Sequence, residues 1–177
     1  MSQLLGGPQL LASCTLAYNG VSLQTVDGLC DTGANGYAFM SEKFAKKLIE
    51  KLRVPIHTDF DPRWLGDYQG NPTEVVNKVI RANLTVQNRT VLDEPFIVMK
   101  QGHDLILGKK WFAAHGILVD CARERLLFPP EWLPDPDWWK TITVDDSPRK
   151  AINPDHQKDV RDREIAMEKE DKARFAG

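Results

Sequence analysis

Hydrophobic and polar positions near the start of the chain predict a β-hairpin. Leu11 to Tyr18 and Val21 to Val26 each carry apolar residues at strand-like spacing. The Asn19-Gly20 dipeptide between them favours a tight hairpin turn, because both central residues of that turn need positive φ. We therefore expect the two runs to pair, and a second turn near Asp27-Gly28 to lead into the next strand.

The pattern with a period of 3.6 residues is clearest over about Glu42 to Leu52, where it predicts an amphipathic helix. Ser41 precedes this run and is a favourable N-cap residue. A second, shorter helix is expected over Lys109 to His115, ended by Gly116. In both helices we expect the apolar side chains to pack inward: Phe44, Ala45, Leu48, Ile49 and Leu52 in the first, and Trp111 and Phe112 in the second.

The other apolar runs predict strands, which gives a mainly β domain. A polar stretch with two glycines, Asp61 to Pro72, interrupts them. The expected strands cover Val54 to Phe60, Thr73 to Val86, Leu92 to Lys100, Leu105 to Gly108, and a closing hairpin of Ile117 to Asp120 with Arg125 to Phe128.

After Pro129 the composition changes. Prolines alternate with Trp132, Trp138 and Trp139, which predicts an arm that packs either on its own domain or on a partner subunit. Acid-to-base pairs at helical spacing then indicate a solvated helix or a linker. We divide the chain into a flexible lead-in (1–10), a folded domain (11–130), a Pro/Trp-rich arm (131–153) and a charged helix or linker (154–177).

Composition excludes several classes of function. The chain has 177 residues with 23 Lys and Arg against 25 Asp and Glu, so we expect neither a nucleic-acid partner nor a membrane partner. Cys14, Cys30 and Cys121 are an odd number without metal-ligand spacing, and we expect buried free thiols and an intracellular, cytoplasmic location. The four histidines are scattered, so we expect no metal and no cofactor.

The candidate chemistry lies in the stretch from Gly28 to Gly36. An apolar run delivers Asp31 into a turn where Gly33 allows unusual backbone angles, and Thr32 can anchor the turn through its hydroxyl. Asp-Thr-Gly alone is also a common surface turn. A second apolar run into glycine, Asp104 to Gly108, makes a catalytic carboxylate the better interpretation.

These motifs, in this order, resemble the retropepsin-like aspartic proteases over about residues 11 to 130. The resemblance rests on Leu29 to Ala34, on a polar hairpin near Gly66 to Gly70, and on Ile106 to Gly108. The tryptophan soon after Gly108 is typical of the long-terminal-repeat retrotransposon (gypsy-like) type. Lys109 departs from the viral pattern, which has Arg there, so no ion pair attributed to that Arg is carried over.

The resemblance implies a small closed β-barrel with a flap hairpin and one or two short helices. It also implies roles for individual residues: Asp31 as the catalytic residue; Thr32, Gly33 and Ala34 in the active-site turn; Tyr68, Gln69 and Gly70 in a substrate-binding flap; and Ile106, Leu107 and Gly108 as structural support. The flap segment, Trp64 to Asn71, also fits an ordinary surface hairpin.

The chemistry of aspartic proteases needs two carboxylates, and the chain has one Asp-Thr-Gly. A C2 homodimer would bring two copies of Asp31 together, and the expected function is an endopeptidase that processes a retrotransposon polyprotein, in the cytoplasm or within virus-like particles. Its expected partners are a second copy of the chain and a peptide or polyprotein substrate. The alternatives are a catalytically silent dimerisation or peptide-binding module, and a domesticated host protease.

Overall fold

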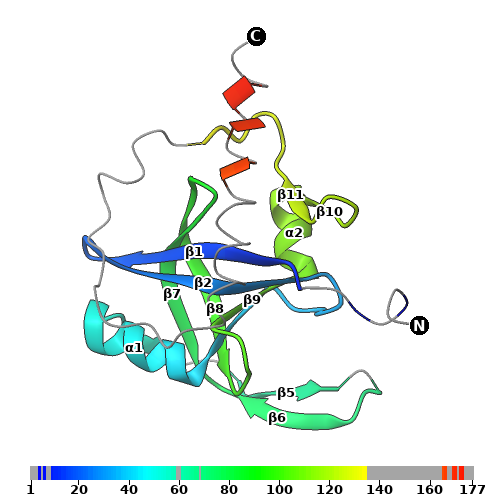
Figure 1. Ribbon diagram of the computed structural model, residues 1–177. Helices are drawn as coiled ribbons and strands as arrows, with labels where there is room; N and C mark the ends of the chain where they lie inside the picture. Colours follow the sequence, from blue (N-terminus) through cyan, green and yellow to red (C-terminus); the bar gives the residue numbers. More distant parts are fainter. Residues whose placement is uncertain are drawn as a thin grey trace.

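The computed structural model describes residues 4, 6, 9–58, 61–67, 69–134, 165, 166, 169, 170, 172 and 173. In this part of the chain most residues lie in strands, and the two helices are short (Figure 1). The predicted mainly β class is confirmed. The elements are β1 (Leu11–Tyr18), β2 (Val21–Asp31), β3 (Ala38–Ser41), α1 (Glu42–Leu52), β4 (Ile56–His57), β5 (Arg63–Gly66), β6 (Pro72–Val76), β7 (Val79–Val86), β8 (Arg89–Met99), β9 (Leu105–Gly108), α2 (Lys109–His115), β10 (Leu118–Asp120) and β11 (Arg125–Leu127).

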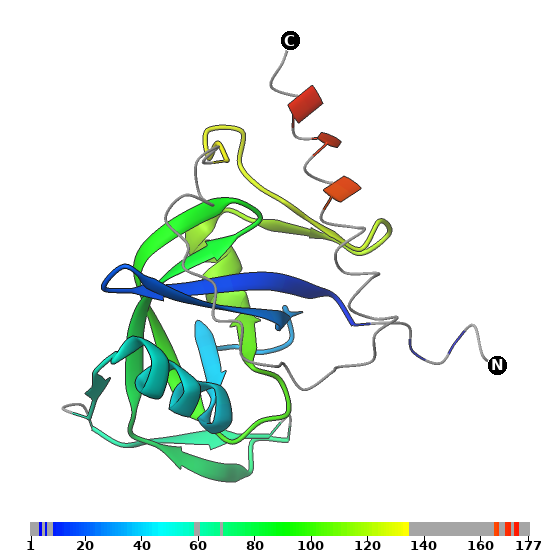
Figure 2. The same cartoon turned by 60° about the vertical axis from the view of Figure 1, so that its left-hand side comes forward.

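Six strands close into a barrel. Their order is β1-β2-β9-β3-β8-β7, and β7 pairs back onto β1, while β4 adds a short seventh strand beside β7. Strands β10 and β11 form a separate hairpin, and so do β5 and β6. Figures 1 and 2 are related by a turn about the vertical axis, so the upper and lower ends of the barrel are the same in both. Both show α1 and the β5–β6 hairpin at the lower end, and β10 and β11 at the upper end.

The first hairpin forms as predicted, but the turn expected at Asp27-Gly28 is wrong. Asn19 and Gly20 have φ of 50° and 76°, and β1 pairs antiparallel with β2. Strand β2 then continues through Gly28 to Asp31. A Cβ on Gly28 would lie 2.7 Å from Cys14 Sγ, so the glycine serves the close approach of β1 to β2 rather than a turn.

Both helices have the predicted bounds. The backbone N–H of Phe44 donates to Ser41 Oγ at 3.1 Å, which is the N-cap bond expected for α1. Gly116 ends α2 in the left-handed conformation with φ of 64°. Trp111 and Phe112 are buried, as expected. The core lies inside the barrel and beneath both helices.

Three strand predictions need correction. Only Ile56 and His57 of the predicted Val54 to Phe60 strand pair, at the edge beside β7; Phe60 lies outside the described residues. The predicted Thr73 to Val86 strand is two strands, because β6 pairs with β5 in the projecting hairpin and β7 pairs inside the barrel. Strand β8 begins at Arg89, before the predicted Leu92, because Gln87 and Asn88 turn tightly with positive φ.

Parts of the terminal predictions fall outside the described residues. This holds for most of the lead-in and for residues 135–164, which include Trp138 and Trp139. Trp132 packs against Phe128 with ring centroids 5.4 Å apart, so this tryptophan lies on its own domain. In the charged segment, residues 165, 166, 169, 170, 172 and 173 are helical, and Glu170 forms an ion pair with Arg125.

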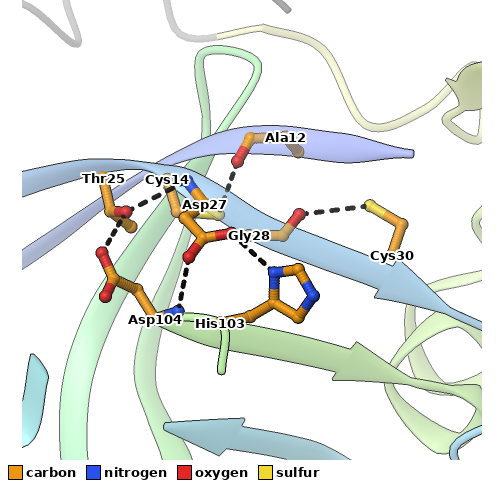
Figure 3. Close-up of polar contacts among 8 residues, drawn as sticks. All are labelled: Ala12, Cys14, Thr25, Asp27, Gly28, Cys30, His103 and Asp104. Atoms are coloured by element: carbon orange, nitrogen blue, oxygen red, sulfur yellow. Dashed lines mark hydrogen bonds and ion pairs between the residues drawn. The ribbon is translucent and has the colours of Figure 1, made fainter. Parts of the chain in front are cut away.

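A partly buried group of polar side chains, called here the Asp104 network (Thr25, Asp27, His103 and Asp104), fixes the loop before β9 onto β2 (Figure 3). The Thr25 hydroxyl donates to Asp104 Oδ2 at 2.7 Å, and the Asp104 N–H donates to Asp27 Oδ2 at 3.0 Å. His103 Nδ1 lies 2.7 Å from Asp27 Oδ1. These bonds set the position at which β9 begins.

The Asp104 network predicts a pH-dependent effect of Asp104→Asn. Burial, with the nearby Asp27 carboxylate, raises the pKa of Asp104. A carboxyl group whose pKa is higher in the folded state stabilises the fold at low pH, and this contribution is lost as the pH rises through the raised pKa. The melting temperature of Asp104→Asn should therefore increase relative to that of the wild type between about pH 4 and 7.

Thermal melts followed by circular dichroism at several pH values would measure this difference. The variant keeps an oxygen that can accept from Thr25, and the His103 pair with Asp27 is present in both proteins. Asp61→Asn, at an exposed position, is the control. A difference between Asp104→Asn and wild type that stays constant with pH would contradict the prediction.

Candidate active site

Asp31 is the last residue of β2 and lies where the strand leaves the barrel. Its side chain is partly exposed, and the backbone N–H of Gly33 donates to Asp31 Oδ1 at 2.9 Å. The N–H of Ala34 donates to the Asp31 carbonyl at 3.2 Å, which closes a tight turn. Thr32 and Gly33 are exposed at the tip of this turn. The turn thus presents an oriented carboxylate at the surface of the barrel.

Strand β9 supports the Asp31 turn from beside it. Strands β2 and β9 are parallel, and Asp31 lies opposite Gly108. Strand β9 also pairs with β3 on its other side, so the segment from 32 to 37 must cross the end of β9 to connect β2 with β3. Ile106 and Leu107 continue the parallel pairing, and Leu107 is fully buried.

Three backbone hydrogen bonds hold the crossing segment onto the start of α2. Gly108 N–H donates to the Tyr37 carbonyl at 2.8 Å, and Lys109 N–H donates to the Ala34 carbonyl at 2.8 Å. Lys110 N–H donates to the Gly36 carbonyl at 3.1 Å. A Cβ on Gly108 would lie 2.3 Å from the Gly36 oxygen, so the crossing requires glycine at this position.

A second group of polar side chains, the Glu94 network (Tyr37, Glu94, Trp111 and His115), lies next to the end of this segment, with Glu94 and Trp111 buried. Tyr37 OH donates to the Glu94 carboxylate at 2.8 Å, and Trp111 Nε1–H donates to Glu94 Oε2 at 3.0 Å. His115 Nε2 lies 3.0 Å from the Tyr37 hydroxyl oxygen. No short sequence pattern predicts this network, although a buried tyrosine or tryptophan usually needs a hydrogen-bond partner.

Electrostatics keeps Glu94 ionised. Burial by itself raises the pKa of Glu94, but the hydrogen bonds from its three neighbours outweigh burial and lower the pKa below its ordinary value. Burial and the Glu94 carboxylate together raise the pKa of Tyr37, so its hydroxyl stays protonated and donates. The network is therefore a carboxylate surrounded by donors.

The β5–β6 hairpin is the segment predicted as a flap. It extends toward the same side of the barrel as the end of β2 (Figures 1 and 2). Asp67 organises its tip: Asp67 Oδ1 accepts from the N–H groups of Gln69 and Asn71, both at 2.9 Å. Gln69 and Gly70 are exposed, and Tyr68 lies outside the described residues. Of the predicted flap residues, two therefore lie at the exposed tip.

One face of the hairpin is apolar and exposed. Trp64 lies opposite Val75 in the strand pairing, and their exposed fractions are 68% and 43%. The Lys100 N–H donates to the Glu74 carboxylate at 3.2 Å, which ties the base of the hairpin to the residue after β8. The base is thus attached, while the aromatic face and the tip remain open to contact.

None of the three cysteines forms a disulfide. Cys14 and Cys30 are buried, as predicted, and their thiols donate to the carbonyls of Ala12 and Gly28 (Figure 3). Cys121 is exposed. In the described part of the chain, no three His, Cys, Asp or Glu side chains are grouped so as to bind a metal. No helix in these residues has the length and apolar character needed to cross a membrane.

Comparison with solved structures finds similarity to the retroviral protease-like domain of Ddi1 from Leishmania major. The sequence identity is 18%, the match covers 69% of this chain and 90% of that chain, and the TM-score is 0.47. Neither a protein-family model nor a curated protein matches the chain.

The crossing of the Asp31 segment over β9 predicts that Gly108→Ala is destabilising. The added methyl would displace the Gly36 carbonyl, and overpacking of this kind costs about 1–3 kcal/mol of unfolding free energy. Gly102→Ala is a matched control, because among the described residues no atom lies within 4 Å of a Cβ added there. Urea unfolding would measure both variants, and equal stability of the two would contradict this role of Gly108.

Proposed function

We propose that this protein is a retropepsin-like aspartic endopeptidase that acts as a homodimer, with one Asp31 from each subunit in the active site. The observation that carries the proposal is the Asp31 turn. Its carboxylate is oriented by the Gly33 N–H, and its chain is held across the end of β9. Such placement of a carboxylate at the end of a buried strand suits catalysis better than packing.

Hydrolysis by this site needs a pair of carboxylates that share one proton. Two carboxylates a few ångströms apart do not both ionise easily, so the pair titrates as one unit. The ionised carboxylate takes a proton from water as the water oxygen bonds to the scissile carbonyl carbon, and the protonated carboxylate donates to the carbonyl oxygen. The C–N bond then breaks as the carboxyl group that took the water proton donates it to the amine nitrogen, and a hydroxyl of the intermediate returns its proton to the other carboxylate.

The β5–β6 hairpin is the proposed substrate flap. Backbone groups near Gln69 and Gly70 can bond an extended peptide, and an attached base with an open tip suits a segment that closes over substrate. An extended peptide between the hairpin and the Asp31 turn would have its scissile bond next to the paired carboxylates. We propose a polyprotein as the natural substrate.

Asp31→Asn should abolish cleavage and leave the fold intact, because the amide cannot take a proton from water. The measurement is cleavage of a diverse peptide mixture between about pH 4 and 7, with products identified by mass spectrometry. Wild-type activity should rise faster than linearly with enzyme concentration while the dimer is partly dissociated. Asp93→Asn is the control, because Asp93 forms an exposed ion pair with Arg81.

Full activity of Asp31→Asn would refute the proposed chemistry. Sedimentation of the wild type at the assay concentrations would establish the oligomeric state. If the wild type is a dimer and cleaves no peptide at any concentration, the fold serves as a dimerisation or peptide-binding module instead.

A further inference from the structure

Glu94 is a buried carboxylate that peptide hydrolysis does not use. It lies on β8 with 5% of its surface exposed, and an isolated charge at such a site is strongly disfavoured. The hydrogen bonds from Tyr37 and Trp111, and His115 Nε2 at 3.5 Å from Glu94 Oε2, compensate for the burial. These three partners come from the segment after the Asp31 turn and from α2, so Glu94 joins the two.

Proton positions in the Glu94 network follow from the count of donors. Tyr37 has one hydroxyl proton, and the ionised Glu94 is its acceptor at 2.8 Å. His115 Nε2, 3.0 Å from the Tyr37 oxygen, must then carry a proton in order to donate to that oxygen. Every bond therefore points toward Glu94, directly or through Tyr37. A residue of the same shape that is itself a donor would oppose this arrangement.

The network fixes the segment that follows the Asp31 turn at a second place. Its backbone is held at Gly108, Lys109 and Lys110, which are the last residue of β9 and the first two of α2. Its side-chain attachment is the Tyr37 hydroxyl, which Glu94 holds together with Trp111 and His115 further along α2. Displacement of α2 relative to Tyr37 would therefore strain the backbone bonds that support Asp31.

Aromatic rings surround His115 and limit the access of water to the network. Trp111 lies with its ring centroid 5.1 Å from that of His115, and Trp132 lies at 5.4 Å. Arg89 Nε donates to the Trp132 carbonyl at 2.9 Å, which holds Trp132 in place. Hydrogen bonds are stronger where water is excluded, so this packing strengthens the attachment of Tyr37.

We propose that Glu94 is a positioning residue for Asp31, because it holds Tyr37 and α2 in the one arrangement that keeps the Asp31 turn in place. This inference rests on the proposed endopeptidase function. Glu94 contacts neither substrate nor the reacting atoms, and it acts through Tyr37 and the backbone bonds of Gly108, Lys109 and Lys110.

The test uses Glu94→Gln and Tyr37→Phe in the full chain. Glu94→Gln keeps the shape but turns an amide donor toward the donors of the network, and Tyr37→Phe removes one hydroxyl. We expect kcat to fall by about tenfold or more in Glu94→Gln and less in Tyr37→Phe, with KM changed by less than about twofold. Leu84→Ala, a core variant in β7, is the control for loss of stability alone, and its kcat should be unchanged below its melting temperature.

A second measurement does not depend on activity. Hydrogen exchange of the Gly108, Lys109 and Lys110 amides should be faster in Glu94→Gln and Tyr37→Phe than in the wild type, and faster than in a Leu84→Ala sample of equal global stability. Unchanged exchange in the two variants would overturn the positioning role. If wild-type cleavage depends on Asp31, an unchanged kcat in the two variants would overturn it as well. If the wild type shows no Asp31-dependent cleavage, the endopeptidase function is refuted. Faster exchange in the two variants would then still support the role of Glu94 in holding the turn.

Discussion

The close contact between Gly108 and the Gly36 carbonyl is the constraint on which the candidate site depends. Strand β9 lies between β2 and β3, so the chain that leaves Asp31 must cross the end of β9 to continue. The crossing is close enough that a Cβ on Gly108 would lie 2.3 Å from the Gly36 oxygen. The same closeness lets three consecutive N–H groups reach carbonyls of the crossing segment. The order of the strands therefore determines the geometry of the candidate site.

Elements that depend on neighbouring residues could be predicted from the sequence. The Asn19-Gly20 turn, the Ser41 cap and the Gly116 helix end all need residues within a few positions of one another, and all three form as expected. Gly28 was wrongly assigned to a turn because the reason for its glycine is Cys14 on the adjacent strand. Local sequence does not distinguish a glycine needed for a turn from one needed for close packing.

Part of the candidate site could also be predicted from the sequence, and part could not. The Asp31 turn and Gly108 could be found because each carries a short motif, and the structure places them opposite each other. The Glu94 network could not be found, because Tyr37 is 57 positions from Glu94 and 78 from His115. No short pattern joins residues so far apart, and Glu94 stands in a strand whose alternating pattern gave no sign of a buried acid. Only the burial of Trp111, which was predicted, gave a signal that a polar partner was needed.

The pKa values of two carboxyl groups, the partly buried Asp104 and the buried Glu94, are shifted in opposite directions. Asp104 accepts from Thr25 but lies near the Asp27 carboxylate, and its pKa is raised, mainly by burial. Glu94 is surrounded by donors, and its pKa is lowered. Protonation of Asp104 relieves its repulsion with Asp27, whereas protonation of Glu94 would remove the charged acceptor of the Tyr37 and Trp111 hydrogen bonds. The low pKa of Glu94 therefore favours the ionised form, on which the attachment of Tyr37 depends.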